Sequence, residues 1–319
     1  MIKFIDLFSG VGGFHLALKN KANCVFACEW DKYARITYEA NFKNELIEND
    51  AQFAQDITKI NYNDIPDFDI LCAGFPCQPF SVAGKQLGFT HQTQGTLFFN
   101  IIEIIHLKQP KVVFLENVKN LTTHDKGNTF NVILKSLTNE GYFIHHKILN
   151  TKNHANIAQN RERIFILAFK NKTHYDKFEF PKEVSLTSSI FDCLENKKVD
   201  NKFYLTNKKS IPIQKILEQV QNKNSIYQYR RYYIRENKNN VCPTLTANMG
   251  TGGHNVPFIL DNWGVRKLTP RECFNFQGFP KNFVLPQNVP NSSLYKQAGN
   301  SITVSVVEKI ANKILIALK

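Results

Sequence analysis

The first 170 residues alternate short apolar runs with helical patterns, and this alternation restricts the fold more than any other feature. Strands are predicted at residues 3–8, 23–30, 67–75, 111–118, 143–150 and 161–169. Helices are predicted at residues 14–20, 32–42, 96–109 and 129–140. Because strands and helices alternate regularly, we predict βαβ units and an α/β fold with a doubly wound, mostly parallel sheet.

The pattern changes near residue 185. Residues 185–262 are polar, rich in Lys and Asn, and irregular, which indicates a smaller unit with many loops. Regular patterns return after Trp263, and residues 304–319 form a clear amphipathic helix. We therefore expect a discontinuous large domain, residues 1–184 plus 291–319, and a small domain at 185–290 that includes a hinge.

Charge and cysteine content restrict the partners and the compartment. The chain has 40 Lys and Arg against 27 Asp and Glu, a net charge of +13, which favours a polyanion such as nucleic acid as partner. The seven cysteines form no CxxC pair and no cluster with zinc spacing, so we expect neither disulfides nor a metal. No signal peptide or membrane-spanning run is apparent, so we expect a cytoplasmic protein without membrane contact.

The stretch "DLFSGVGGF" follows a predicted strand and opens a predicted helix, a context that suits a nucleotide-type ligand at a helix N-terminus. The spacing of Gly10, Gly12 and Gly13 is not G-x-G-x-x-G, so an ordinary tight turn is the alternative. Glu29 ends the second strand, where an acidic side chain can bond ribose hydroxyls. Trp30 beside it either packs on a base or belongs to the core.

The stretch "GFPCQPFS" follows the third predicted strand, at the carboxyl edge where open α/β sheets bind ligands. Its two prolines disfavour a continuing helix or sheet, so Cys77 is predicted to lie on a loop. The thiol is either buried and inert or presented as a nucleophile, which requires ionisation. Glu116 ends another strand and is either solvated or a proton donor in a pocket.

Two further stretches carry clustered arginines. "QNRERIF" places Arg161 and Arg163 two residues apart at the start of a strand, so both point to one face and suit a phosphate or a base carbonyl. A solvated strand edge is the alternative. "YRRYYIRENK" interleaves aromatic and basic residues, which is typical of a nucleic-acid surface but also of a charged face.

Together these stretches resemble the DNA (cytosine-5) methyltransferases, especially the bacterial enzymes of restriction–modification systems. The resemblance spans nearly the whole chain and keeps the motif order of the family. It is carried by "DLFSGVGGF", "EWD", "QDIT", "GFPCQPFS", "GTLFF", "ENVKN", "QNRERIF", "RKLTPRECFNFQGFP" and "YKQAGNS". It implies a Rossmann-like, S-adenosylmethionine-dependent methyltransferase fold and methylation of carbon 5 of a cytosine flipped out of a specific duplex DNA sequence. It also implies a monomer whose cognate restriction endonuclease is a genetic partner, not a stable complex.

The resemblance also implies roles for individual residues. Cys77 looks like the nucleophile that adds to carbon 6, Glu116 like the acid that bonds ring nitrogen 3, and Arg163 like the donor to the cytosine carbonyl, with Arg161 supporting the pocket. The implied methyl-donor residues are Phe8, Gly10, Gly12, Gly13, Glu29, Trp30, Asp56, Ile57, Gly74, Pro76, Leu97 and Asn300. The implied DNA-binding residues are Gln78, Ser81, Arg230, Arg231, Arg235, Thr244, Leu245, Asn248 and His254. By analogy, the loop at residues 76–95 should close over flipped DNA.

Three other functions fit the sequence less well. The RNA-modifying branch of the same family usually carries a Cys-Phe-Thr tripeptide in its small domain, and this chain has none. A catalytically inactive binding module would not need Cys77, Glu116 and both arginines. A nicotinamide oxidoreductase is disfavoured because G-x-G-x-x-G is absent.

Overall fold

The computed structural model describes residues 1–76, 97–206, 211–230, 233–237, 239–251 and 255–319. Its strands are β1 (Lys3–Leu7), β2 (Asn23–Cys28), β3 (Gln52–Ala54), β4 (Ile70–Gly74), β5 (Val112–Val118), β6 (Phe143–Asn150), β7 (Glu162–Phe169), β8 (Ile226–Arg230), β9 (Tyr233–Asn237), β10 (Phe258–Leu260) and β11 (Val265–Lys267). Its α-helices are α1 (Gly13–Leu18), α2 (Lys32–Glu48), α3 (Leu97–Lys108), α4 (Asn128–Asn139), α5 (Thr151–His154), α6 (Lys172–Lys177), α7 (Ile211–Gln219), α8 (Pro270–Phe276), α9 (Asn291–Asn300) and α10 (Val304–Ala317).

The larger sheet has seven strands in the order β3-β2-β1-β4-β5-β7-β6. Strands β1 to β5 pair in parallel, whereas β7 is antiparallel to both β5 and β6. The predicted α/β fold with a mostly parallel sheet is therefore confirmed. The prediction missed β3, because its three residues are too few to show a pattern of alternation. The strand order reverses between β1 and β4, the place where open α/β sheets bind ligands.

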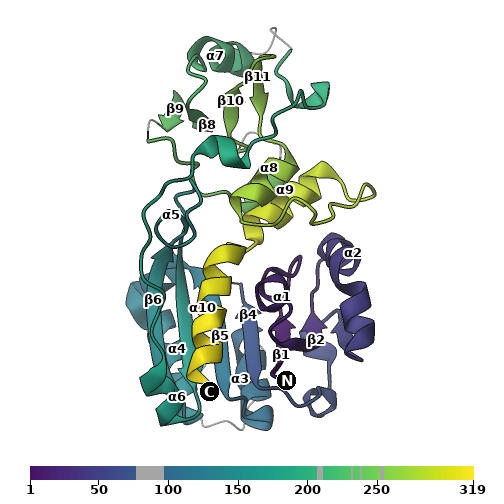
Figure 1. Cartoon of the computed structure of the whole chain (residues 1–319), viewed down its shortest axis with the longest axis vertical. Coiled ribbons are helices and arrows are strands. Elements are labelled where there is room, and N and C mark those ends of the chain that lie inside the picture. The colour runs from purple at the N-terminus through teal and green to yellow at the C-terminus, as the bar shows by residue number, and fades with distance from the viewer. Residues whose placement is uncertain (77–96, 207–210, 231–232, 238, 252–254) are drawn as a thin grey trace.

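Helices cover both faces of this sheet, with α1, α2 and α10 on one face and α3 and α4 on the other (Figure 1). Strand β5 shows why its sequence is a continuous apolar run. Val112 and Phe114 belong to the core under α10, while Val113 and Leu115 belong to the core under α3, and all four are fully buried. A strand that is covered on both faces needs apolar residues at every position.

A second sheet has four antiparallel strands in the order β11-β10-β8-β9. With α7 it encloses a small core of its own, formed by Ile216, Val220, Tyr227, Phe258 and Val265. Helices α8 and α9 lie between the two sheets (Figure 1). Other side chains from residues 185–290, among them Cys193, Leu245 and Phe274, pack in the core of the larger sheet, so this region contributes to both cores.

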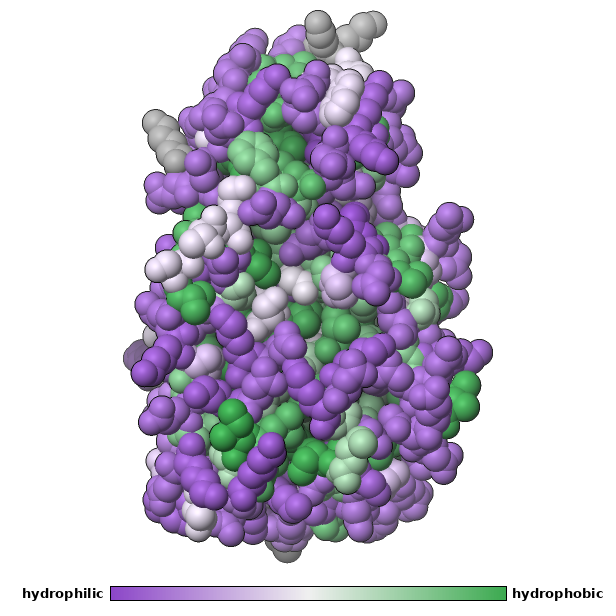
Figure 2. Space-filling view, viewed as in Figure 1, coloured by the Kyte–Doolittle hydropathy of each residue, from purple (hydrophilic) through white to green (hydrophobic). Residues whose placement is uncertain are grey.

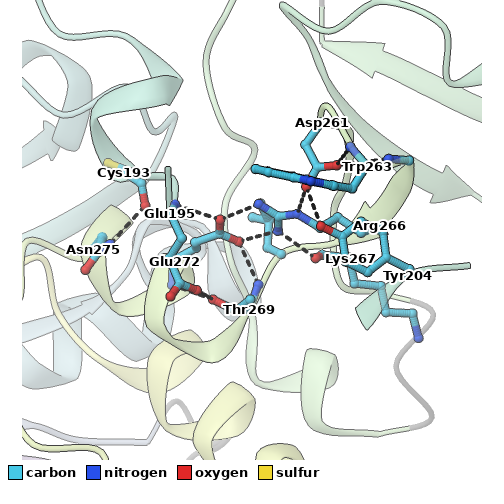
Figure 3. Close-up of polar contacts among 12 residues, drawn as sticks. Cys193, Glu195, Tyr204, Asp261, Trp263, Arg266, Lys267, Thr269, Glu272 and Asn275 are labelled. Atoms are coloured by element: carbon cyan, nitrogen blue, oxygen red, sulfur yellow. Dashed lines mark hydrogen bonds and ion pairs between the residues drawn. The ribbon is translucent and has the colours of Figure 1, made fainter. Parts of the chain in front are cut away.

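A buried ionic network joins the smaller sheet to α8 (Figure 3). Arg266 of β11 is fully buried, and its Nε donates to Asp261 Oδ2 at 2.6 Å. Its Nη1 and Nη2 donate to Glu272 Oε2 and Oε1 at 2.8 and 2.7 Å. Glu272 lies in the first turn of α8, which Thr269 caps through a capping box. The small sheet is thus anchored by charge-assisted hydrogen bonds as well as by apolar packing.

The surface is mainly polar. Figure 2 shows hydrophilic residues over most of one face, with hydrophobic residues in small groups between them. Two aromatic side chains, Trp30 and Tyr233, are 70% and 58% exposed. Of the helices that the structure describes, none is long and apolar enough to cross a membrane.

Candidate active site

The turn between β1 and α1 leaves an open space above the carboxyl edge of the sheet. Phe8, Gly10 and Gly12 have φ angles of 53°, 56° and 85°, in the left-handed region. A Cβ on Gly12 would lie 2.3 Å from a ring carbon of Phe42, so only glycine fits against α2. A Cβ on Gly10 would have no heavy atom within 4 Å. Gly10 therefore lines free space at the switch point of the strand order.

The carboxylate of Glu29 lies beside this turn. Its Oε2 accepts from the backbone amide of Gly10 and its Oε1 from that of Asp31, both at 2.7 Å. Burial raises the pKa of Glu29, and the two amide hydrogen bonds oppose that shift. Trp30 is 70% exposed, which excludes the core alternative for it. This arrangement fits a nucleoside-type methyl donor. The carboxylate suits its ribose, the exposed indole its base, and the open turn its amino-acid part.

Four more of the predicted methyl-donor residues lie at the starts or ends of helices. Asp56 caps a short 3-10 helix (Ile57–Lys59), and its Oδ1 accepts from the amide of Thr58 at 3.0 Å. Hydrogen bonds from Thr58 lower the pKa of Asp56, while Ile57 is buried. Leu97 begins α3, and Asn300 ends α9 with its side chain exposed.

The end of β4 meets the end of β5. Gly74 pairs with Glu116 in the sheet, and a Cβ on Gly74 would lie 3.7 Å from Glu116 Oε2. Pro76 is exposed, and Cys77, Gln78 and Ser81 lie outside the described residues. Cys72, which lies within β4, is fully buried, and burial raises its pKa well above the ordinary range, as expected for an inert thiol.

Glu116 and Arg163 form a buried ion pair at this edge. Their side chains are 10% and 14% exposed, and Arg163 Nε lies 3.1 Å from Glu116 Oε1. The pair forms because β7 runs antiparallel to β5, which puts the start of β7 beside the end of β5. Burial raises the pKa of Glu116, and the positive charges of Arg163 and Arg161 only partly offset this. Glu116 therefore keeps a proton more readily than an exposed glutamate.

Arg161 and Arg163 have different surroundings despite their close spacing. Arg161 is 1% exposed, and its guanidinium donates to the backbone carbonyls of Leu245, Gly299 and Ser301. Arg161 therefore ties the start of β7 to the segment after β9 and to the end of α9. Arg163 instead directs its Nε to Glu116 and its Nη1 to the carbonyl of Glu162 at 2.8 Å.

Asn117 is a site residue that the sequence patterns did not single out. It is 3% exposed, and its Nδ2 donates to the carbonyl of Phe75 at 2.8 Å. This bond holds the backbone two residues before Cys77 against the end of β5. The signal was present in the stretch "ENVKN", where Asn117 directly follows Glu116.

A polar cleft of about 640 Å³ lies between the smaller sheet and the edge of the larger one. Its lining includes Arg230, Arg235 and Thr244 from the predicted DNA-binding set, and Lys152 and Asn160 from the other side. Among the described residues of that set, Asn248 is exposed on the 3-10 helix Ala247–Gly250, whereas the Leu245 side chain is 1% exposed. The Leu245 carbonyl accepts from Arg161 at 2.7 Å, and the Leu245 amide donates to Gln159 Oε1 at 3.3 Å. Arg231 and His254 lie outside the described residues.

Comparison with known proteins gives one consistent result. The profile of the family described as C-5 cytosine-specific DNA methylase matches residues 2–315. Type II methyltransferase M.Bsp6I of Bacillus sp. (strain RFL6) is 51% identical over 317 residues, with 98% of each chain covered. Type II methyltransferase M.HhaI of Haemophilus parahaemolyticus is 40% identical over 326 residues, covering 98% of this chain and 94% of the relative.

Solved structures share the fold at low sequence identity. A mutant of DNMT2 from Spodoptera frugiperda superposes with a TM-score of 0.74 at 19% identity, covering 98% of this chain and 99% of the other. The Dnmt2 methyltransferase of S. pombe superposes with a TM-score of 0.73 at 20% identity over 100% of both chains. The family match and the high identity of the type II relatives agree with the site geometry. The chain therefore belongs to the C-5 cytosine-specific DNA methylases and is a DNA (cytosine-5) methyltransferase of the restriction–modification type.

Proposed function

We propose that this enzyme methylates carbon 5 of a cytosine flipped out of a specific short duplex DNA sequence, through a covalent bond between Cys77 and carbon 6. The observation that supports it most is the buried Glu116–Arg163 pair at the end of β5, beside the end of β4. The hydrogen bond from Asn117 to Phe75 draws the chain just before Cys77 to the same place.

Each proposed step uses a property of these residues. The Cys77 thiolate adds to carbon 6, which makes carbon 5 electron-rich, and Glu116 shares its proton with ring nitrogen 3 so that no full negative charge develops on the ring. Among the described residues Arg163 uses Nε and Nη1 for Glu116 and Glu162, so its Nη2 would donate to the cytosine carbonyl oxygen. After carbon 5 has accepted the methyl group, loss of its proton and elimination of the Cys77 thiolate restore the aromatic ring.

S-adenosylmethionine would supply an electrophilic methyl group for carbon 5. We propose that Glu29 binds its ribose hydroxyls, that Trp30 packs on its adenine, and that Asp56 and Ile57 lie at the adenine edge. The glycine turn with Phe8 would lie along its amino-acid part, and Gly74, Pro76, Leu97 and Asn300 would complete the site. The exposed indole and the open space at Gly10 support this assignment.

We propose residues 1–184 plus 291–319 as the catalytic domain and residues 185–290 as the DNA-recognition domain. Arg230, Arg235 and Thr244 line the polar cleft, and Asn248 is exposed, which supports a role for them in contacting the duplex. Gln78, Ser81, Arg231, Leu245 and His254 complete the proposed DNA-binding set. The enzyme would act as a cytoplasmic monomer and protect host DNA from a cognate restriction endonuclease.

The central experiment measures transfer of a labelled methyl group to duplex DNA. We expect Cys77→Ala to abolish transfer, because alanine cannot add to carbon 6. Cys72→Ala is the matched control, because this thiol is fully buried within β4 and should leave transfer intact. Normal transfer by Cys77→Ala would rule out the covalent mechanism.

Two further measurements define the substrate. DNA with 5-fluorocytosine at the target should trap the enzyme covalently, because carbon 5 then has no proton to lose. Bisulfite mapping of DNA from cells that express the chain should show methylated cytosines within one short sequence. Methylation scattered without a common sequence would contradict the proposed modification role.

A further inference from the structure

Helix α9 contacts the proposed methyl-donor site on one side through an ion pair. Lys296 Nζ lies 2.7 Å from Asp31 Oδ2, and the two side chains are 52% and 29% exposed. The other oxygen of Asp31 caps α2 by accepting from the amides of Tyr33 and Ala34 at 2.9 and 3.0 Å. Lys296 therefore fixes the start of α2 from outside.

This ion pair continues into the glycine turn. The amide of Asp31 donates to Glu29 Oε1, and Glu29 Oε2 accepts from the amide of Gly10, both at 2.7 Å. The orientation of Glu29 thus depends on the backbone of Asp31, which Lys296 holds. Trp30 lies between Glu29 and Asp31 in the same short loop.

Hydrogen bonds at two positions hold α9, and the segment before it, against α2. Thr37 Oγ1 donates to Gln297 Oε1 at 3.0 Å in a buried position. Asn41 and Val284 exchange two hydrogen bonds, at 3.0 and 2.7 Å. Displacement of α9 would therefore also disturb the helix that Asp31 caps.

The face of α9 that carries Ser292, Lys296 and Gly299 contacts the 3-10 helix Ala247–Gly250 with almost no space between the two backbones. A Cβ on Gly250 would lie 2.5 Å from the carbonyl oxygen of Ser292 and 3.1 Å from Lys296 Cβ. A Cβ on Gly299 would lie 2.1 Å from the carbonyl carbon of Thr246. The polar cleft is lined by Thr244 and Thr246, directly before this 3-10 helix.

We propose that α9 couples binding of the methyl donor to binding of DNA, and that Lys296 is the positioning residue for this coupling. Its ammonium holds the Glu29–Trp30–Asp31 loop, while its Cβ touches the segment that borders the cleft. Each ligand would contact one of the two segments that Lys296 joins, so a position of α9 that favours one ligand also favours the other, and the enhancement is reciprocal. This inference rests on the proposed function.

The test measures the Kd of S-adenosylhomocysteine by calorimetry, with and without a duplex that carries the mapped recognition sequence. The coupling is the Kd measured without the duplex divided by the Kd measured with it. Lys296→Met removes the charge but keeps the stem against Gly250, and it should weaken binding and lower the ratio by about two- to five-fold, as expected for a half-exposed ion pair. Lys296→Arg should keep the wild-type ratio.

Lys21→Met is the matched control, because Lys21 forms a similar ion pair of 2.7 Å with Glu308 on α10. It should leave both Kd values unchanged. Gly250→Ala tests the contact between α9 and the 3-10 helix. Its Cβ would lie 2.5 Å from the Ser292 carbonyl oxygen, so it should displace α9 and lower the ratio. Wild-type ratios in both Lys296→Met and Gly250→Ala would overturn the coupling, whereas a wild-type protein that neither binds the cofactor nor methylates DNA would overturn the proposed function itself.

Discussion

Arg266 is fully buried and Arg163 is 14% exposed, and each lies next to a glutamate, yet the two glutamates differ in how completely they are hydrogen-bonded. Glu272 accepts both Nη groups of Arg266 and the backbone amides of Thr269 and Glu195, at 2.7–2.9 Å (Figure 3). Among the described residues, the carboxylate of Glu116 has a single polar contact, the ion pair with Arg163 Nε at 3.1 Å.

The electrostatic consequences follow from this difference. Burial alone would lower the pKa of Arg266, but its bonds to Glu272 and Asp261 outweigh burial and raise it. At Glu116 burial prevails over the attraction of Arg163 and raises the pKa of the carboxyl. A saturated network has no capacity left for a ligand, whereas an incompletely bonded carboxyl at the carboxyl edge of the sheet can still bond a substrate. The first arrangement stabilises the fold, and the second is suited to catalysis.

The largest effect is expected from Glu116→Gln. Glutamine keeps the shape of the side chain and can still accept from Arg163 Nε, but it has no proton to share with ring nitrogen 3. We expect the single-turnover methylation rate, measured per folded molecule, to fall by about 10²–10⁴-fold. A rate within tenfold of wild type would remove Glu116 from the mechanism.

Glu272→Gln should show the opposite behaviour. It leaves the buried charge of Arg266 with Asp261 alone, so the free energy of unfolding should fall by about 3–5 kcal/mol. Denaturant unfolding measures this, with Glu308→Gln as the control on an exposed ion pair. The rate per folded molecule should be nearly unchanged. A loss of rate as large as that of Glu116→Gln would show that the two sites are not functionally distinct.

The pH dependence separates the two sites further. Because the pKa of Glu116 is raised, its neutral form is present to higher pH than in an exposed glutamate, and the form that donates is lost as the pH rises through the folded pKa. The same sign applies to stability, since the contribution of neutral Glu116 is present at low pH and declines above that pKa. The single-turnover rate of the wild type should therefore decline as the pH rises above the pKa of Glu116. This decline should be absent in Glu116→Gln. An identical alkaline decline in both proteins would assign it to another group.

The smallest effect is expected at the cap of α8. Thr269 Oγ1 accepts from the amide of Glu272 at 3.2 Å and donates to Glu195 Oε2 at 2.6 Å. Thr269→Ala should cost about 1 kcal/mol of the free energy of unfolding, and Thr269→Ser should recover most of it. Both variants should methylate normally when thermal unfolding shows them to be folded, and reduced methylation by the folded alanine variant would link this network to the active site.

The sequence by itself determined the class of fold and the edge at which the chemistry lies. Short apolar runs that alternate with helical patterns, as at β5, predict strands buried on both faces, and the ends of such parallel strands place Gly10, Glu29 and Glu116 at one edge. The motif order was enough for the family, because these residue types at these spacings leave few alternatives. Residues 52–54 were missed because a strand of three residues carries no periodic signal.

Only the tertiary structure decided which contacts residues close together in the sequence form. Arg161 and Arg163 are two residues apart, but Arg161 meets carbonyls of Leu245, Gly299 and Ser301, which are distant in sequence. The exposure of Trp30, the bond from Asn117 to Phe75 and the contact of Lys296 with Asp31 have the same origin. Burial and hydrogen bonding depend on which segments pack together, and spacing along the chain carries no information about partners that are distant in sequence.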